Sequence, residues 1–196
     1  MVNSPVYGLI LAGGESRRMG RDKALLQRDG QSQLDYVAAL LEGALDRTFV
    51  SVRQEQQGEP ERGRFSTIAD RYEGIGPVAG ILSAMDEYPD ADWLVVACDL
   101  PNINAATLEY LLENRSQEQP FTAFRSSYDE LPEPLCAVYR GASNTIVREF
   151  VESGMVCPRK ILIRSDTLLL DQPDPHALDN INTPDDLERS VLGTAT

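Results

Sequence analysis

The chain has 196 residues, a length that suits one compact domain spanning residues 1–196 rather than two domains of ordinary size. Hydrophobic residues make up 42% and charged residues 25% of the chain, a composition that excludes intrinsic disorder. The 18 Lys and Arg residues against 31 Asp and Glu residues give a net charge of −13, so nucleic acid and an anionic membrane surface are both disfavoured as partners.

Short apolar runs alternate with helical patterns along the chain. The run at residues 6–12 ends abruptly in two glycines, which is typical of a strand buried on both faces of a parallel sheet. Further strands are expected at 48–52, 65–69, 93–98, 121–124, 136–139 and 167–170. Helices are expected at 34–45, 78–85, 105–113, 142–152 and 184–192, and a surface loop is expected at 54–64. This alternation predicts an α/β fold: a three-layer sandwich with a mostly parallel, Rossmann-like sheet.

Two features of the sequence bear on its compartment. Cys98, Cys136 and Cys157 are odd in number and lack a metal-binding spacing, so we expect reduced thiols. No apolar run approaches the roughly 18 residues of a membrane-spanning helix, and no positively charged segment precedes the first apolar run. We therefore expect a cytoplasmic protein.

The residues that follow the strands are the candidates for chemistry, because ligands of open α/β sheets bind beyond the carboxyl ends of the strands. The first strand is followed by a glycine-rich segment that carries four basic residues: Arg17, Arg18, Arg21 and Lys23. Glycines allow backbone N–H groups to surround a phosphate, and basic side chains neutralise it. The segment matches neither the Walker A pattern nor GxGxxG. It is interpreted as a phosphate-binding loop, with a solvated Arg-rich turn as the alternative.

Two aspartates follow other strands, and each has a structural alternative. Asp99 comes directly after the most apolar strand and is interpreted as a metal ligand, although it could instead cap the following turn. Asp70 could hold a ligand or form a surface ion pair with Arg71. The glycines within 74–80 are equally consistent with turns and helix packing or with a ligand-lining loop.

Four ordered motifs carry a family resemblance. The stretch LAGGESRRMGRDKALL resembles the signature of the molybdenum cofactor guanylyltransferases, the MobA family. The segments GIGPVAGI, VVACDLPNI and NINTPDDL, at 74–81, 95–103 and 180–187, are similar to the family's later motifs, so the resemblance covers essentially the whole chain. It implies a nucleotide-diphospho-sugar transferase-like fold and a Mg²⁺-dependent enzyme. The implied enzyme transfers GMP from GTP to the terminal phosphate of molybdenum-molybdopterin and releases pyrophosphate.

The resemblance also implies roles for individual residues. Backbone groups would meet the guanine nucleotide at Leu11, Ala12, Gly13 and Gly14. Lys23 would reach the phosphates, Asp70 would help to hold the nucleotide, and Asp99 would bind Mg²⁺. The catalytic set would be Lys23, Asp99 and Arg17, and Asn180 and Asn182 would lie on the cofactor side. Arg53 stands where the family commonly has Asn, and Ala97 where it has Pro.

The chemistry implied by this resemblance is modest. The attacking phosphate monoester has a second pKa of about 6, so no strong general base is needed. Alignment and charge neutralisation then carry catalysis. The implied partners are GTP and the molybdopterin cofactor, together with proteins that insert molybdenum or receive the product. The alternatives are a related nucleotidyltransferase that uses CTP on the same cofactor or acts on a sugar phosphate, and a non-catalytic protein that carries a nucleotide or pterin.

Overall fold

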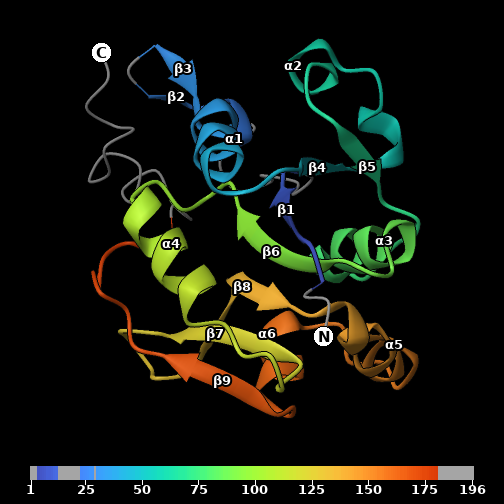
Figure 1. Cartoon of the computed structure of the whole chain (residues 1–196). Helices are drawn as coiled ribbons and strands as arrows, with labels where there is room; N and C mark the ends of the chain where they lie inside the picture. Colours follow the sequence, from blue (N-terminus) through green and yellow to red (C-terminus); the bar gives the residue numbers. More distant parts are fainter. Residues whose placement is uncertain (1–3, 13–22, 29, 181–196) are drawn as a thin grey trace.

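The computed structural model describes residues 4–12, 23–28 and 30–180 (Figure 1). In this part of the chain, seven strands form one sheet in the order β5-β4-β1-β6-β8-β7-β9. Their bounds are Val6–Leu11 (β1), Thr48–Val52 (β4), Thr67–Ala69 (β5), Asp92–Ala97 (β6), Phe121–Arg125 (β7), Pro132–Tyr139 (β8) and Thr167–Leu170 (β9). A separate antiparallel pair joins β2 (Gln27–Arg28) to β3 (Gln31–Ser32).

The helices begin at residues with recognisable start signals. Their bounds are Gln33–Ala44 (α1), Pro60–Gly63 (α2), Pro77–Glu87 (α3), Ala105–Glu113 (α4), Asn144–Glu152 (α5) and Pro158–Ile163 (α6). Short 3₁₀ helices lie at Lys23–Leu25 (η1), Gln54–Gln56 (η2) and Gly141–Ser143 (η3). Ser32 and Asp35 form a capping box at the start of α1, and Pro77 occupies the first turn of α3.

The sheet is covered by helices on both faces, which confirms the expected three layers (Figure 1). Side chains of neighbouring residues in β1 point to opposite faces of the sheet. Ile10 packs in one core with Leu41 of α1 and with residues of α4, whereas Leu9 packs in the other with Ile81 of α3 and residues of α5 and α6. Trp93 is fully buried in this second core.

The strand directions confirm a mostly parallel sheet. β1 runs parallel to β4 and β6, β4 runs parallel to β5, and β7 runs parallel to β9. β8 runs antiparallel to both of its neighbours, β6 and β7. The carboxyl ends of β5, β4, β1 and β6 therefore lie along one edge of the sheet.

Several local expectations need correction. The expected surface loop at 54–64 contains η2 and α2, and Arg62 within it is only 2% exposed. The segment folds in this way because Pro60 suits the first helical turn and Arg62 pairs with Glu59. β8 is longer than expected, and α6 was not expected at all. The expected helix at 184–192 lies outside the described residues. Among the helices that the structure describes, none combines the length and apolarity needed to cross a bilayer.

Candidate active site

The predicted positions that follow β1, β5 and β6 lie at the carboxyl edge of the sheet. Leu11 at the end of β1 pairs in register with Ser51 of β4 and with Ala97 of β6. The N–H of Cys98 donates to the carbonyl of Leu11 at 3.3 Å, and the N–H of Asp70 donates to that of Val52 at 2.8 Å. Ladder hydrogen bonds therefore hold the residues that follow β1, β5 and β6 at one edge, where ligands of such sheets bind.

Asp70 is a half-buried carboxylate held by its neighbours. The hydroxyl of Ser51 donates to Oδ1 of Asp70 at 2.7 Å, and Nε2 of Gln54 donates to the backbone carbonyl of Asp70 at 2.8 Å. Burial raises the pKa of Asp70, although the Ser51 hydrogen bond and the Arg53 charge partly oppose that effect. The alternative of an ion pair with Arg71 is wrong, because Arg71 pairs with Glu87. Asp70 thus faces the edge of the sheet as a partly desolvated acid.

Asp99 lies in the turn that follows β6 and is partly exposed. The preceding Cys98 is 4% exposed and packs in the core. Within the described ranges, no three His, Cys, Asp or Glu side chains gather into a group that could hold a metal. Mg²⁺ bound through one or two carboxylates and substrate phosphates does not need such a group, and a carboxylate is the hard oxygen ligand that it prefers. The chemistry of Asp99 therefore fits that ion.

The glycines of the segment 74–81 serve turns and packing. Gly76 has φ 59° and ψ −141°, a conformation that side chains rarely allow, and it directly precedes α3. A Cβ atom on Gly80 would lie 2.3 Å from Oγ of Ser51 and 3.0 Å from Cδ2 of Leu11. Gly80 therefore lets α3 approach the sheet directly behind the candidate site.

Arg62 is a residue of this edge that sequence reasoning missed. Its Nη2 donates to the carbonyl of Ala12 at 3.2 Å, and its Nη1 pairs with Glu59. Pro60 was the available signal, since proline is frequent in the first turn of a helix. The polar residues and glycines around Pro60 are typical of a loop, and a surface loop was therefore expected at 54–64.

The remaining predicted residues are placed as follows. Leu11 ends β1, and Ala12 after it is 4% exposed. Lys23 is the first residue of η1, and Asn180 is exposed. Gly13, Gly14, Arg17 and Asn182 lie outside the described residues.

Arg53 and Asn102 each make a contact near the candidate site. Arg53 is 32% exposed and pairs with Glu55 at 3.2 Å. Nδ2 of Asn102 donates to the carbonyl of His176 at 3.2 Å. That contact connects the turn carrying Asp99 with the segment that leads to Asn180.

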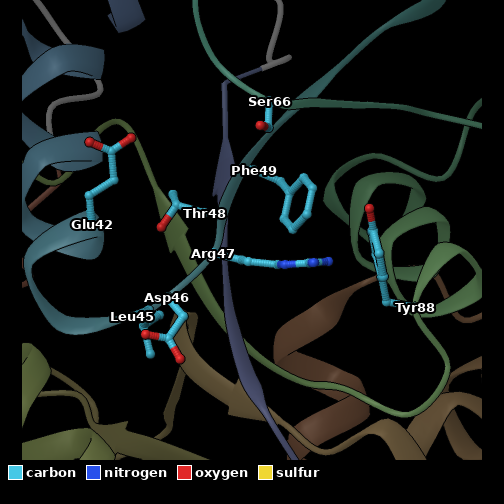
Figure 2. A pocket seen from close by; sticks show the side chains of 8 residues that line it. All are labelled: Glu42, Leu45, Asp46, Arg47, Thr48, Phe49, Ser66 and Tyr88. Atoms are coloured by element: carbon cyan, nitrogen blue, oxygen red, sulfur yellow. The ribbon is translucent and has the colours of Figure 1, made fainter.

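A cavity of about 500 Å³ lies at the other end of β4 (Figure 2). It is lined by Glu42, Leu45, Asp46, Arg47, Thr48, Phe49, Ser66 and Tyr88. These residues end α1, begin β4, precede β5 or follow α3. The cavity therefore opens near the amino ends of the strands, away from Asp70 and Asp99, and it is not the candidate active site.

Residues 8–165 match the family described as the MobA-like NTP transferase domain. A molybdenum cofactor biosynthesis bifunctional protein from Synechocystis is 38% identical over 184 residues, which cover 93% of this chain and 53% of that protein. The chain thus spans about half the length of that relative. A molybdenum cofactor guanylyltransferase from a Shewanella species is 29% identical over 198 residues, covering 97% of this chain and 98% of that protein.

Solved structures with the same fold include a molybdopterin-guanine dinucleotide biosynthesis protein and a cytidylyltransferase. Molybdopterin-guanine dinucleotide biosynthesis protein A from Archaeoglobus fulgidus has a TM-score of 0.77 and 26% identity, covering 93% of this chain and 95% of that one. The 2-C-methyl-D-erythritol 4-phosphate cytidylyltransferase from Thermus thermophilus has a TM-score of 0.70 and 12% identity, covering 96% and 98%. The second likeness concerns the fold alone.

Proposed function

This chain belongs to the MobA-like NTP transferase family, and we propose that it transfers GMP from GTP to the terminal phosphate of molybdenum-molybdopterin. The observation that carries this proposal is the placement of Ala12, Asp70 and Asp99 at one edge of the sheet, Ala12 being the residue that precedes the glycine-rich segment in the sequence. Relatives named molybdenum cofactor guanylyltransferase that align over nearly their whole length support it.

The proposed reaction exchanges one phosphoanhydride bond for another. An oxygen of the acceptor phosphate attacks the α-phosphorus of GTP, and the bond to the β-phosphate breaks with release of pyrophosphate. The acceptor phosphate has a second pKa of about 6, so at neutral pH it is already largely ionised and no residue has to remove a proton. The protein's task is therefore to align the two phosphates and to neutralise their charge.

Each residue at the edge has a proposed part in that task. Backbone groups of Leu11, Ala12, Gly13 and Gly14 bind the nucleotide, and Asp70 helps to hold it. Asp99 would hold Mg²⁺, which supplies charge neutralisation at the phosphates when it is bound. Lys23 and Arg17 would neutralise charge on the phosphates and on the leaving pyrophosphate. Asn180 and Asn182 bind on the side of the molybdopterin acceptor.

The proposed reaction also implies a cellular compartment and protein partners. We place the activity in the cytoplasm, since all three cysteines are free thiols, as expected in a reducing compartment. Proteins that insert molybdenum would deliver the acceptor, and client molybdoenzymes would receive the dinucleotide.

A thermal-shift experiment with four nucleoside triphosphates and Mg²⁺ tests the choice of nucleotide. Binding to the native state stabilises it by about 2.7 kcal/mol when the ligand is at 100 times its Kd. We expect GTP to raise the melting temperature most. A larger shift with CTP than with GTP would contradict the guanine assignment.

The metal role of Asp99 is tested by two variants in the same experiment. Asp99→Ala should remove the part of the GTP shift that depends on Mg²⁺. Asp90→Ala, at an exposed position before the same strand, should leave that part unchanged. Equal Mg²⁺ dependence in wild type and Asp99→Ala would refute the metal role.

A further inference from the structure

The segment 54–64 contacts the ends of two strands at the carboxyl edge of the sheet. Nε2 of Gln54 donates to the carbonyl of Asp70, directly after β5. Nη2 of Arg62 donates to the carbonyl of Ala12, directly after β1, and it does so across 50 residues of sequence. The connection between β4 and β5 therefore contacts Ala12, the residue that directly precedes the glycine-rich segment in the sequence.

Arg62 is held there as a buried cation. Its side chain is 2% exposed, whereas its partner Glu59 is 39% exposed. A buried guanidinium requires charged or polar partners, because its desolvation is otherwise too costly. The guanidinium donates through Nη1 to the carboxylate of Glu59 and through Nη2 to the carbonyl of Ala12. The ion pair with Glu59 thus fixes the direction in which Nη2 reaches Ala12.

We propose that Arg62 is a positioning residue for nucleotide binding, which it serves by fixing the peptide of Ala12. This inference rests on the proposed function, in which backbone groups of residues 11–14 bind the nucleotide. A binding group that is already oriented in the free protein does not have to be ordered when the ligand arrives, and this lowers the entropic cost of binding.

Arg62→Met and Arg62→Lys test the proposal, with Arg64→Met as the matched control. Arg64 lies next to the same short helix, is 52% exposed and pairs with Asp35 on α1 instead of reaching the strand ends. We expect Arg62→Met to raise the Kd and KM for GTP about tenfold, which corresponds to the loss of about 1.4 kcal/mol. The KM for the acceptor should stay unchanged, and Arg64→Met should match the wild type in all three constants.

Arg62→Lys keeps the inference testable if the Met variant does not fold. Lysine keeps the buried charge beside Glu59, but its single ammonium lacks the planar fork that serves two acceptors at once. We therefore expect a melting temperature close to that of the wild type together with a raised Kd for GTP. A purely structural role predicts the opposite pattern, a lowered melting temperature with an unchanged Kd for GTP in the folded variants, and that result would overturn the proposal.

The same measurements separate this inference from the proposed function. The nucleotide that the wild type binds most tightly, among GTP, CTP, ATP and UTP, tests the proposed function. The ratio of variant to wild-type Kd for that nucleotide tests the role of Arg62. If the wild type binds CTP most tightly and the Arg62 variants raise the Kd for CTP, the role of Arg62 is supported and the guanine assignment is contradicted. A wild type that binds none of the four nucleotides would overturn both the role of Arg62 and the proposed function.

Discussion

The hydroxyl of Ser51 donates a hydrogen bond of 2.7 Å to a carboxylate oxygen of Asp70. Ser51 belongs to β4, and Asp70 follows the neighbouring strand β5. Behind Ser51 lies Gly80 of α3, where a Cβ atom would come within 2.3 Å of the serine Oγ. The orientation of a carboxylate with a proposed role in nucleotide binding therefore depends on how closely a helix approaches the sheet.

Gly80→Ala should disturb this arrangement. The added methyl group would collide with Ser51 and press against Leu11, so either α3 or the serine has to move. We expect a loss of stability of about 1–3 kcal/mol, the usual cost of overpacking, and weaker GTP binding. Chemical denaturation and a GTP titration measure the two effects.

Gly43→Ala is the control for that substitution. Gly43 lies in α1, and a Cβ atom there would meet nothing within 4 Å. Alanine is favoured over glycine in helices by about 1 kcal/mol, so this variant should be as stable as the wild type or more stable. If Gly80→Ala behaved like Gly43→Ala, the close approach of α3 would not matter for the site.

Asp70→Asn should make the protein more stable at neutral pH while weakening nucleotide binding. Burial raises the pKa of Asp70 above its ordinary value of 3.8, so between the two values the folded state binds more protons than the unfolded state. Stability therefore falls as pH rises through that window, and the ionised carboxylate is destabilising above it. Melting temperatures measured from pH 3 to 7 should show an advantage of the variant that grows with pH. A wild type that melts higher than Asp70→Asn at pH 7 would contradict this account.

Asp86 should have the opposite pH dependence. Burial acts to raise its pKa, but hydrogen bonds from Tyr72, Asn144 and Arg148 outweigh burial and lower the pKa below 3.8. The ionised carboxylate joins α3 to α5, and its contribution is present above pH 3.8 and is lost as pH falls through the lowered pKa. Asp86→Asn should thus cost about 1 kcal/mol at pH 7 and less in acid.

The neighbouring Glu87 is the control for Asp86. Glu87 pairs with Arg71 at the surface, where both side chains are more than 40% exposed. Solvent screens such a pair, so Glu87→Gln should leave the melting temperature almost unchanged at every pH. Equal losses in the two variants would indicate that the partly buried hydrogen-bond network of Asp86 adds nothing.

The elements that follow simple patterns could be predicted from the sequence. The strand at 48–52, the helix at 105–113 and the strand at 167–170 have the expected bounds, because apolar residues recur in them at regular spacing. β8 begins earlier than expected, since Pro132 and Pro134 in its first half argue against a strand. α6 has six residues, too few for the helical period to show.

The site was harder to predict than the fold. Asp70 and Asp99 could be found because each directly follows an apolar strand, and such positions collect at one edge of a parallel sheet. The partners of these residues could not be found in this way. Ser51 reaches Asp70 from the neighbouring strand, and Arg62 reaches Ala12 from a segment whose composition suggests a loop. Such contacts arise from tertiary packing, which local periodicity does not record.

The proposed guanylyl transfer is tested most directly by incubating the purified chain with GTP, Mg²⁺ and molybdenum-molybdopterin and measuring both products. We predict that pyrophosphate and the guanine dinucleotide form in equal amounts, and that Asp99→Ala forms neither. Failure to release pyrophosphate from GTP, together with rapid turnover of CTP or of a sugar phosphate under the same conditions, would contradict it.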